Sequence, residues 1–271
     1  MSDMQRRRGM KVLTYSEAKE QGLDVPTPDP IVCEWCGSTL EPIGMTGFQG
    51  AFHWIGAEPC GCDGAAKQRE EEAEREELEA KARQREAFVR CGVKRRFLDA
   101  TICHASLSNY LDGFSESPGV GLYICGPSRA GKTYSASAIA MAFCASGYRT
   151  IITTSLSMLD AVKASFDGDA KHGIARFASC DILIVDDLGK ENANSWVMTT
   201  LFQIINERYE AMRPTIVTSQ YMPDELMRRM SRNGERESAV AITERLKETC
   251  RLIRLPRRAN VNLMEEVLRD A

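Results

Sequence analysis

A glycine-rich segment near the middle of the chain constrains the fold more than any other feature. It has the pattern G-x-x-x-x-G-K-T, and its residues are Gly126, Pro127, Ser128, Arg129, Ala130, Gly131, Lys132 and Thr133. An apolar run precedes the segment and a helical pattern follows it, so it connects a strand to a helix. Such a loop turns backbone N–H groups toward phosphate oxygens, and the helix N-terminus adds positive potential. We therefore expect an ATP/ADP-binding P-loop, with Lys132 on the phosphates and Thr133 on Mg²⁺.

Two adjacent acids follow a second apolar run. Residues 181–187 read Asp-Ile-Leu-Ile-Val-Asp-Asp. A P-loop site needs a carboxylate at the end of a neighbouring strand to hold Mg²⁺, and many such sites place a second acid beside it to activate water. We expect Asp186 to bind Mg²⁺ and Asp187 to orient the attacking water. Hydrolysis should be slow, because Asp is one methylene shorter than the Glu more common at the second position.

Several polar residues after the fourth apolar run are further candidates. Gln220 is placed to position the water, with an ordinary polar loop as the alternative. Arg245 follows a helical run and precedes the last strand, where an arginine can reach the nucleotide of a neighbouring subunit. A solvated side chain is the default for the other arginines of this region. Arg257 or Arg258 could sense nucleotide within the same subunit, and Arg228, Arg229 and Arg232 could meet a nucleic-acid backbone.

The C-terminal two thirds of the chain alternate between strand-like and helical patterns. Strand-like runs lie at 121–125, 150–154, 181–185, 215–218 and 252–255. Helical patterns lie at roughly 132–147, 156–166, 194–212 and 237–249. This alternation predicts an α/β fold with a five-stranded parallel sheet that helices cover on both faces.

Four of the ten cysteines form two close pairs near the N-terminus. They are Cys33 and Cys36, and Cys60 and Cys62. Two chelating pairs of thiolates suit a tetrahedral, structural Zn²⁺ site. Residues 32–63 contain too few aliphatic side chains for a core of their own, and a metal would replace that core. His53 is the competing ligand nearby, and an iron–sulfur cluster is the alternative on ligand count.

Composition divides the chain into three parts. We expect an N-terminal zinc-binding domain at 1–63, a charged helical linker at 64–91 and an ATPase domain at 92–271. The linker is expected to be solvated, with a partner-binding helix as the alternative. A net charge of −3 gives no general attraction to nucleic acid. The chain has no apolar run near the roughly 20 residues that a membrane helix needs, and we expect a cytoplasmic protein.

Residues 92–258 resemble the DnaC/DnaI-type replicative helicase loaders, which are AAA+ ATPases related to the IstB transposition helpers. The resemblance rests on the segments 92–101, 121–134, 182–191, 214–221 and 242–246. It implies an AAA+ core in which Lys132, Thr133, Asp186 and Asp187 serve the nucleotide. It also implies that Arg245 acts on the nucleotide of a neighbouring subunit. Position 220 is more often Asn in this family.

The resemblance also implies a mechanism. ATP bound between subunits would order an oligomer that holds single-stranded DNA, while residues 1–90 would grip a hexameric replicative helicase. A zinc-binding N-terminal region is similar to the DnaI-like branch. DNA contacts would come from Lys163, Phe166 and Lys171, with core packing as the other interpretation of Phe166.

Three other functions are compatible with the motifs. An IstB-like transposition helper would share the core and bind duplex DNA and a transposase. A small-molecule kinase would use the same P-loop without an arginine from a neighbouring subunit. A regulatory protein would bind DNA through its cysteine-rich region and use ATP only for stability.

Overall fold

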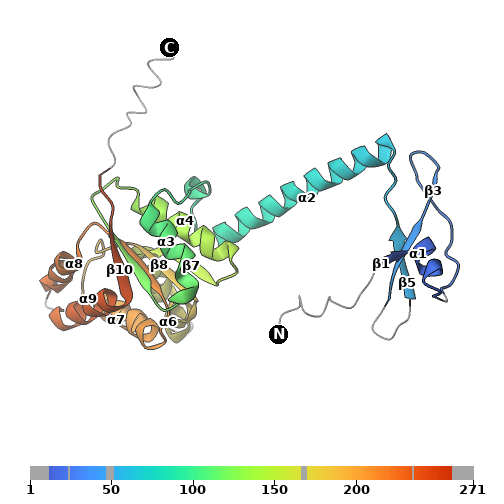
Figure 1. Ribbon diagram of the computed structural model, residues 1–271. Coiled ribbons are helices and arrows are strands. Elements are labelled where there is room, and N and C mark those ends of the chain that lie inside the picture. Colours follow the sequence, from blue (N-terminus) through green and yellow to red (C-terminus); the bar gives the residue numbers. More distant parts are fainter. Residues whose placement is uncertain (1–11, 24, 47–51, 166–169, 234, 258–271) are drawn as a thin grey trace, which may run out of the picture. The chain divides into compact units, whose positions relative to one another are not determined.

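The computed structural model describes residues 12–23, 25–46, 52–165, 170–233 and 235–257 (Figure 1). Its contacts divide the chain into two compact units, residues 1–81 and residues 82–271. No helix among the described residues is both long enough and apolar enough to cross a membrane.

The first unit is built on a small antiparallel sheet in the order β1-β4-β5. Its elements are β1 Val12–Thr14, α1 Tyr15–Glu20, β2 Ile31–Val32, β3 Thr39–Leu40, β4 Pro42–Thr46 and β5 Phe52–Ala57. A capping box starts α1, because the Thr14 hydroxyl accepts from the Glu17 N–H and the Glu17 carboxylate accepts from the Thr14 N–H.

The core of this unit draws on residues outside the cysteine-rich segment. Leu13, Ala18 and Val25 are buried, and Phe52 and Trp54 pack against them. The sequence patterns predicted no helix or strand in residues 1–31. This segment nevertheless supplies β1, α1 and most of that core. The aliphatic side chains that the cysteine-rich segment lacks therefore come from the residues before it.

Helix α2 spans Asp63–Arg90 and is rich in charged residues. Ion pairs one turn apart line its surface, such as Lys67 with Glu71 and Lys81 with Glu77. Such pairs support a solvated helix that has little apolar surface to bury.

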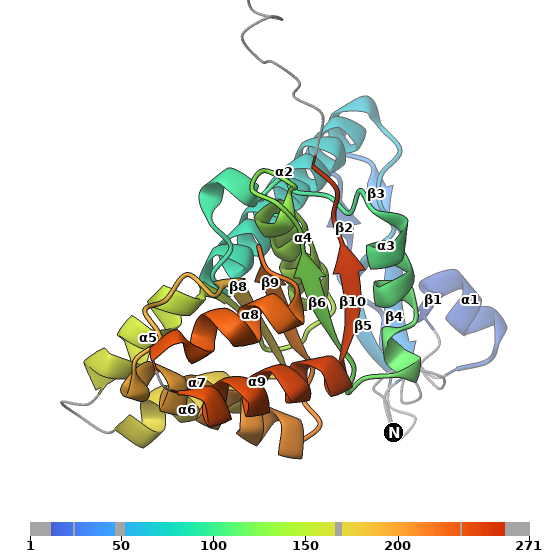
Figure 2. The ribbon, with the colours of Figure 1, turned by 90° about the vertical axis from the view of Figure 1, so that its left-hand side faces the viewer.

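The second unit contains a five-stranded sheet whose order is β10-β6-β9-β8-β7. The strands are β6 Gly121–Cys125, β7 Thr150–Thr154, β8 Ile182–Leu188, β9 Thr215–Ser219 and β10 Cys250–Arg254. Every neighbouring pair is parallel, and β6 and β10 lie side by side in Figure 2. The predicted five-stranded parallel sheet is therefore confirmed.

Helices cover both faces of this sheet. They are α3 Ala105–Asp112, α4 Lys132–Ala145, α5 Ser155–Ala164, α6 Ala170–Ser179, α7 Ser195–Glu210, α8 Pro223–Met230 and α9 Arg236–Thr249. Short 3₁₀ turns lie at Arg95–Phe97, Phe114–Glu116 and Ser231–Asn233. The sequence patterns did not identify α3, α6 or α8. The strand predicted at 181–185 extends through the acidic pair to Leu188.

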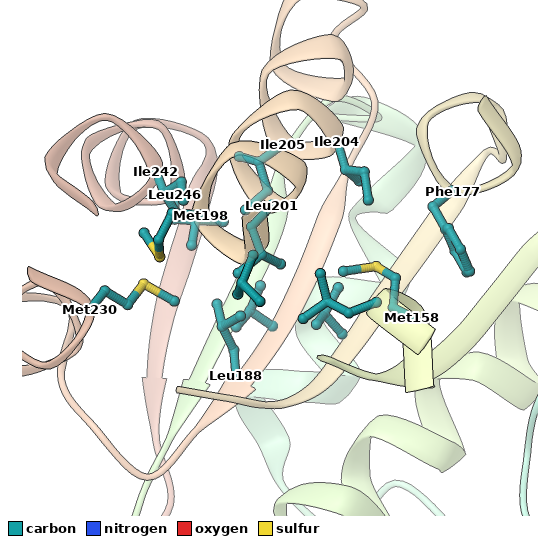
Figure 3. Close-up of a cluster of buried hydrophobic side chains, with 14 of the residues drawn as sticks. Met158, Phe177, Leu188, Met198, Leu201, Ile204, Ile205, Met230, Ile242 and Leu246 are labelled. Atoms are coloured by element: carbon teal, nitrogen blue, oxygen red, sulfur yellow. The ribbon is translucent and has the colours of Figure 1, made fainter. Parts of the chain in front are cut away.

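Two apolar clusters fill the space between the sheet and its helices. Alternate strand residues point to opposite faces of the sheet. Leu122 and Ile124 belong to the first cluster, together with residues of α3 and α4. Tyr123 and Cys125 belong to the second cluster, together with residues of the helices from α5 through α9. Figure 3 shows side chains of the second cluster, where helices and strands meet around Leu201. This packing fixes the carboxyl ends of β6 and β8, where the motifs lie.

Arg208 of α7 is fully buried and satisfies a ring of backbone oxygens. Its guanidinium donates to the carbonyls of Phe177, Cys180 and Pro214 and to the Thr215 hydroxyl. It thereby ties the end of α6 to the start of β9.

We expect Arg208→Met to lower the free energy of unfolding by about 3 kcal/mol or more, because several buried carbonyls lose their donor. Urea denaturation checks this. Arg149→Met is the control, since Arg149 is largely exposed and pairs with Asp181. The control should cost less than about 1 kcal/mol. Equal losses in the two variants would contradict this account of Arg208.

Candidate functional site

The glycine-rich segment joins the end of β6 to the start of α4 and has the backbone of a phosphate loop. Arg129 and Gly131 adopt positive φ angles of 65° and 87°. At Gly126 an added Cβ would lie 2.4 Å from the Leu255 carbonyl oxygen, so only glycine fits between the loop and the end of β10. The loop is followed at once by α4, which directs its free N–H groups at the same space.

Lys132 lies at the centre of this loop. It is only 6% exposed, and its Nζ donates to the carbonyl oxygens of Gly126 at 2.8 Å and Pro127 at 2.9 Å. Burial lowers the pKa of Lys132, while Asp187 and Asp186 oppose that shift. A buried ammonium held only by carbonyl oxygens is well prepared to bind a phosphate oxygen.

Asp186, at the carboxyl end of β8, accepts hydrogen bonds from two hydroxyl groups. Its carboxylate accepts from the Thr133 hydroxyl at 2.9 Å and from the Thr218 hydroxyl at 2.6 Å. Burial raises the pKa of Asp186, and both hydroxyls oppose that rise. Carboxylate and hydroxyl oxygens are ligands that Mg²⁺ prefers. Thr133 and Asp186 thus lie together as a Mg²⁺ site requires.

Asp187 adopts a left-handed φ of 59°, which is uncommon for a residue with a side chain. Its N–H donates to the Thr218 hydroxyl at 2.9 Å, and this bond helps to hold the strained backbone. Its carboxylate lies 2.8 Å from the Nζ of Lys190.

A cavity of about 400 Å³ opens over these groups. Its lining includes residues 128–134 of the loop and α4, together with Asp187, Lys190, Gln220, Arg96 and Phe97. The volume falls in the range that small-molecule sites occupy. The structure thus brings together the loop, the acidic pair and Gln220, which are far apart in the sequence.

The structure gives Gln220 and Arg245 different surroundings. Gln220 is exposed and lines both this cavity and a neighbouring one beside Arg228, Arg229 and Arg232. Arg245 lies on α9.

The guanidinium of Arg245 stacks on two rings of α7. It lies 4.9 Å from the ring centre of Phe202 and 5.3 Å from that of Tyr209. Action on a neighbouring subunit requires Arg245 to leave these rings, and that role stays a prediction.

Other candidates lie partly beyond the described residues. Arg257 is exposed after β10, whereas Arg258 lies outside the described residues. Of the proposed DNA contacts, Lys163 is exposed on α5 and Phe166 lies outside the described residues. Lys171 lies in α6.

The four N-terminal cysteines converge on one point. The Sγ atoms of Cys33, Cys36, Cys60 and Cys62 all lie within 4.8 Å of one another. The Cys33–Cys62 and Cys36–Cys60 separations are 3.8 Å and 3.5 Å. Tetrahedral Zn²⁺ with bonds of about 2.3 Å requires sulfurs about 3.8 Å apart. The donor set therefore fits Zn²⁺, and His53 is not part of the cluster.

The cysteine loop is preorganised by hydrogen bonds. The Gly37 N–H donates to the Cys33 carbonyl, and Gly37 has a φ of 71°. Backbone hydrogen bonds lower the pKa of Cys33, and contact with the Ser38 hydroxyl lowers the pKa of Cys36 to about 6. These two shifts favour the thiolate form, which is the form that binds metal, whereas contact with the sulfurs of Cys36 and Cys33 raises the pKa of Cys60 to about 12.

Sequence reasoning assigned no role to Lys190 or Phe97, and it named Thr218 only as a candidate behind Gln220. Thr218 bonds both acids, Lys190 pairs with Asp187, and Phe97 forms part of the cavity wall. Thr218 and Lys190 lie inside the segments 214–221 and 182–191, so their positions near the motifs were the available signal. Nothing in the sequence indicates that Phe97 lies beside a loop some thirty residues later.

Comparison with known proteins gives a consistent family. The model of a family described as IstB-like ATP binding protein matches residues 119–259, just over half of the 271 residues. The replicative helicase loader DnaI of Bacillus subtilis is 28% identical over 156 residues, which cover 55% of this chain and 50% of that protein. The Pseudomonas fluorescens insertion sequence IS1162 putative ATP-binding protein is 31% identical over 100 residues, 36% of this chain and 43% of that protein.

The matches thus span half or less of the length of these curated relatives. Among solved structures, the DnaC helicase loader has a TM-score of 0.52 at 21% identity and covers 60% of this chain and 99% of that one. DnaI has a TM-score of 0.53 at 24% identity and covers 60% and 95%. These two structures share the AAA+ fold of the second unit.

Proposed function

The chain belongs to the family of IstB-like ATP binding proteins, and on that premise we propose that it is an ATP-dependent loader that places a hexameric replicative helicase on single-stranded DNA. The observation that carries this choice is the extent of the similarity to DnaI, which covers 55% of the chain, whereas the insertion-sequence relative covers 36%. The first unit, with its cysteine cluster, would be the part that contacts the helicase.

The nucleotide chemistry of the proposal follows from the cavity. Lys132 and the loop N–H groups would bind the phosphates, and Thr133 and Asp186 would hold Mg²⁺. When bound, Mg²⁺ supplies charge neutralisation on the phosphates. Asp187 would orient the attacking water, and Gln220 lines the same cavity. We propose slow hydrolysis, because Asp187 is paired with Lys190 and must first be released.

Self-association through the ATP site is part of the proposal. Arg245 of one subunit would act on the nucleotide of the next, after its guanidinium leaves Phe202 and Tyr209. If so, ATP turnover per chain should rise with protein concentration and fall in Arg245→Ala, while ADP affinity stays unchanged.

The partner is tested by co-purification. We would incubate the full chain with the replicative helicase from the same genome, then with a transposase of the insertion-sequence type, and analyse each mixture by size-exclusion chromatography with light scattering. The proposal predicts a stable complex with the helicase in the presence of ATP. A complex with the transposase and none with the helicase would favour the transposition-helper function instead.

We propose that Cys33, Cys36, Cys60 and Cys62 bind one structural Zn²⁺. Purified protein should contain about one Zn²⁺ per chain by plasma mass spectrometry, since four thiolates form a closed site. Cys36→Ser should lose most of that metal. Cys103→Ser is the matched control, because Cys103 is exposed and lies outside the cluster. Full metal content in Cys36→Ser would contradict the four-cysteine assignment.

A further inference from the structure

Lys190 projects from the turn that follows the acidic pair. This turn is fixed by Glu191, a buried carboxylate that accepts from the Gly189 N–H at 3.0 Å and from the Ser155 hydroxyl at 2.7 Å. The Lys190 side chain is 48% exposed and lines the same cavity as the phosphate loop. Its backbone is therefore held in place, while its ammonium is free to change partners.

The charges around the cavity favour an anion near Lys190. Arg96, Arg129, Lys132 and Lys190 line it, and Asp187 is the only carboxylate in that lining. Lys132 and Lys190 thus place two ammonium groups in the lining of one cavity. A polyphosphate between the two ammonium groups would relieve their repulsion.

We propose that Lys190 is a contact for the terminal phosphate of a nucleoside triphosphate, and that its ammonium exchanges Asp187 for that phosphate when ATP binds. The inference rests on the proposed use of ATP at this site. The exchange breaks and forms only ion pairs. A half-exposed lysine–aspartate pair is weak enough to give way, and a multiply charged phosphate is a stronger partner.

The exchange has a consequence for hydrolysis. While Lys190 pairs with Asp187, the ammonium occupies one oxygen of that carboxylate. ATP draws the ammonium away and frees the carboxylate, whereas ADP lacks the terminal phosphate and leaves the pair intact. Lys190 would therefore distinguish ATP from ADP and couple the release of Asp187 to the presence of the triphosphate.

Binding rather than turnover tests the exchange. We would titrate the full chain in Mg²⁺ with ADP and with the non-hydrolysable analogue AMP-PNP by calorimetry. Lys190→Gln should weaken AMP-PNP by about tenfold and change ADP by less than about twofold, because one charge-assisted contact is lost only with the triphosphate. Lys190→Arg should keep most of the preference for AMP-PNP. The ADP affinity also verifies that each variant is folded.

Lys247→Gln is the matched control. Lys247 is also a lysine paired with an acid three residues earlier, Glu244 at 2.8 Å, and it lies on α9 outside this cavity. It should change the affinity for neither nucleotide.

The double variant separates exchange from simple attraction. Asp187→Asn should tighten AMP-PNP several-fold when Lys190 is present, because the ammonium no longer has a competing partner, and should tighten it less in the Lys190→Gln background. Equal effects of Asp187→Asn in both backgrounds, or equal losses of ADP and AMP-PNP in Lys190→Gln, would overturn the inference.

Failure of the inference and failure of the proposed function are distinguishable. If the unmodified chain binds neither nucleotide, both are wrong. If the affinities follow this pattern but the chain binds no helicase, the exchange stands and the proposed loading function does not.

Discussion

Lys132→Ala is expected to lower the affinity for ATP by at least about 100-fold, or about 3 kcal/mol. The reason is the position of this ammonium, which is buried in the loop and held by the carbonyl oxygens of Gly126 and Pro127. A buried, charge-assisted phosphate contact has no substitute once the ammonium is gone. Calorimetric titration with ATP in Mg²⁺ measures the loss.

The control for this variant is Lys163→Ala. Lys163 is exposed on α5 and does not line the cavity, so ATP affinity should stay within about twofold of the unmodified protein. Circular dichroism should show both variants folded. An unchanged affinity in Lys132→Ala would mean that the loop is not the nucleotide site.

Asp187→Asn is expected to reduce kcat for ATP hydrolysis by about 100-fold or more, while KM does not rise. Its amide cannot take a proton from water, whereas Lys132, Thr133 and Asp186, the residues proposed to bind the nucleotide and its metal, would be unchanged. Phosphate release under saturating ATP measures kcat.

Asp181→Asn is the matched control for Asp187→Asn. Asp181 precedes the other end of β8, where it pairs with Arg149, so its loss should leave kcat unchanged. A full kcat in Asp187→Asn would show that another group activates the water.

The parts of the site that could be predicted from sequence are those set by short segments. The P-loop and the acidic pair carry their chemistry in consecutive residues, and alternating apolar runs place both at the carboxyl ends of parallel strands. The same holds for the cysteine pairs, where local turns bring thiolates together. Local spacing is enough in these cases, because few conformations satisfy it.

The parts that could not be predicted depend on backbone detail or distant packing. The Lys190–Asp187 pair forms where Asp187 adopts a left-handed φ, and no residue pattern predicts that backbone conformation. The surroundings of Arg245 depend on two rings that α7 supplies from about forty residues earlier. Likewise, the core of the first unit joins segments before and after the cysteine pair at 33 and 36.

One missed element did carry a local signal. Helix α8 begins with Pro223, followed by Asp224 and Glu225 in its first turn. Proline at the first helical position and acids near the helix N-terminus are both helix-start signals.

We propose that this chain uses ATP to load a helicase, and retention of the helicase on circular single-stranded DNA is the direct test of that proposal. Circles, helicase and ATP would be incubated with the unmodified chain or with Lys132→Ala, and helicase bound to the circles after gel filtration would be quantified. We expect several-fold more helicase on the circles with the unmodified chain and ATP than with Lys132→Ala or with ADP. Equal retention in all three cases, or no gain over helicase alone, would contradict it.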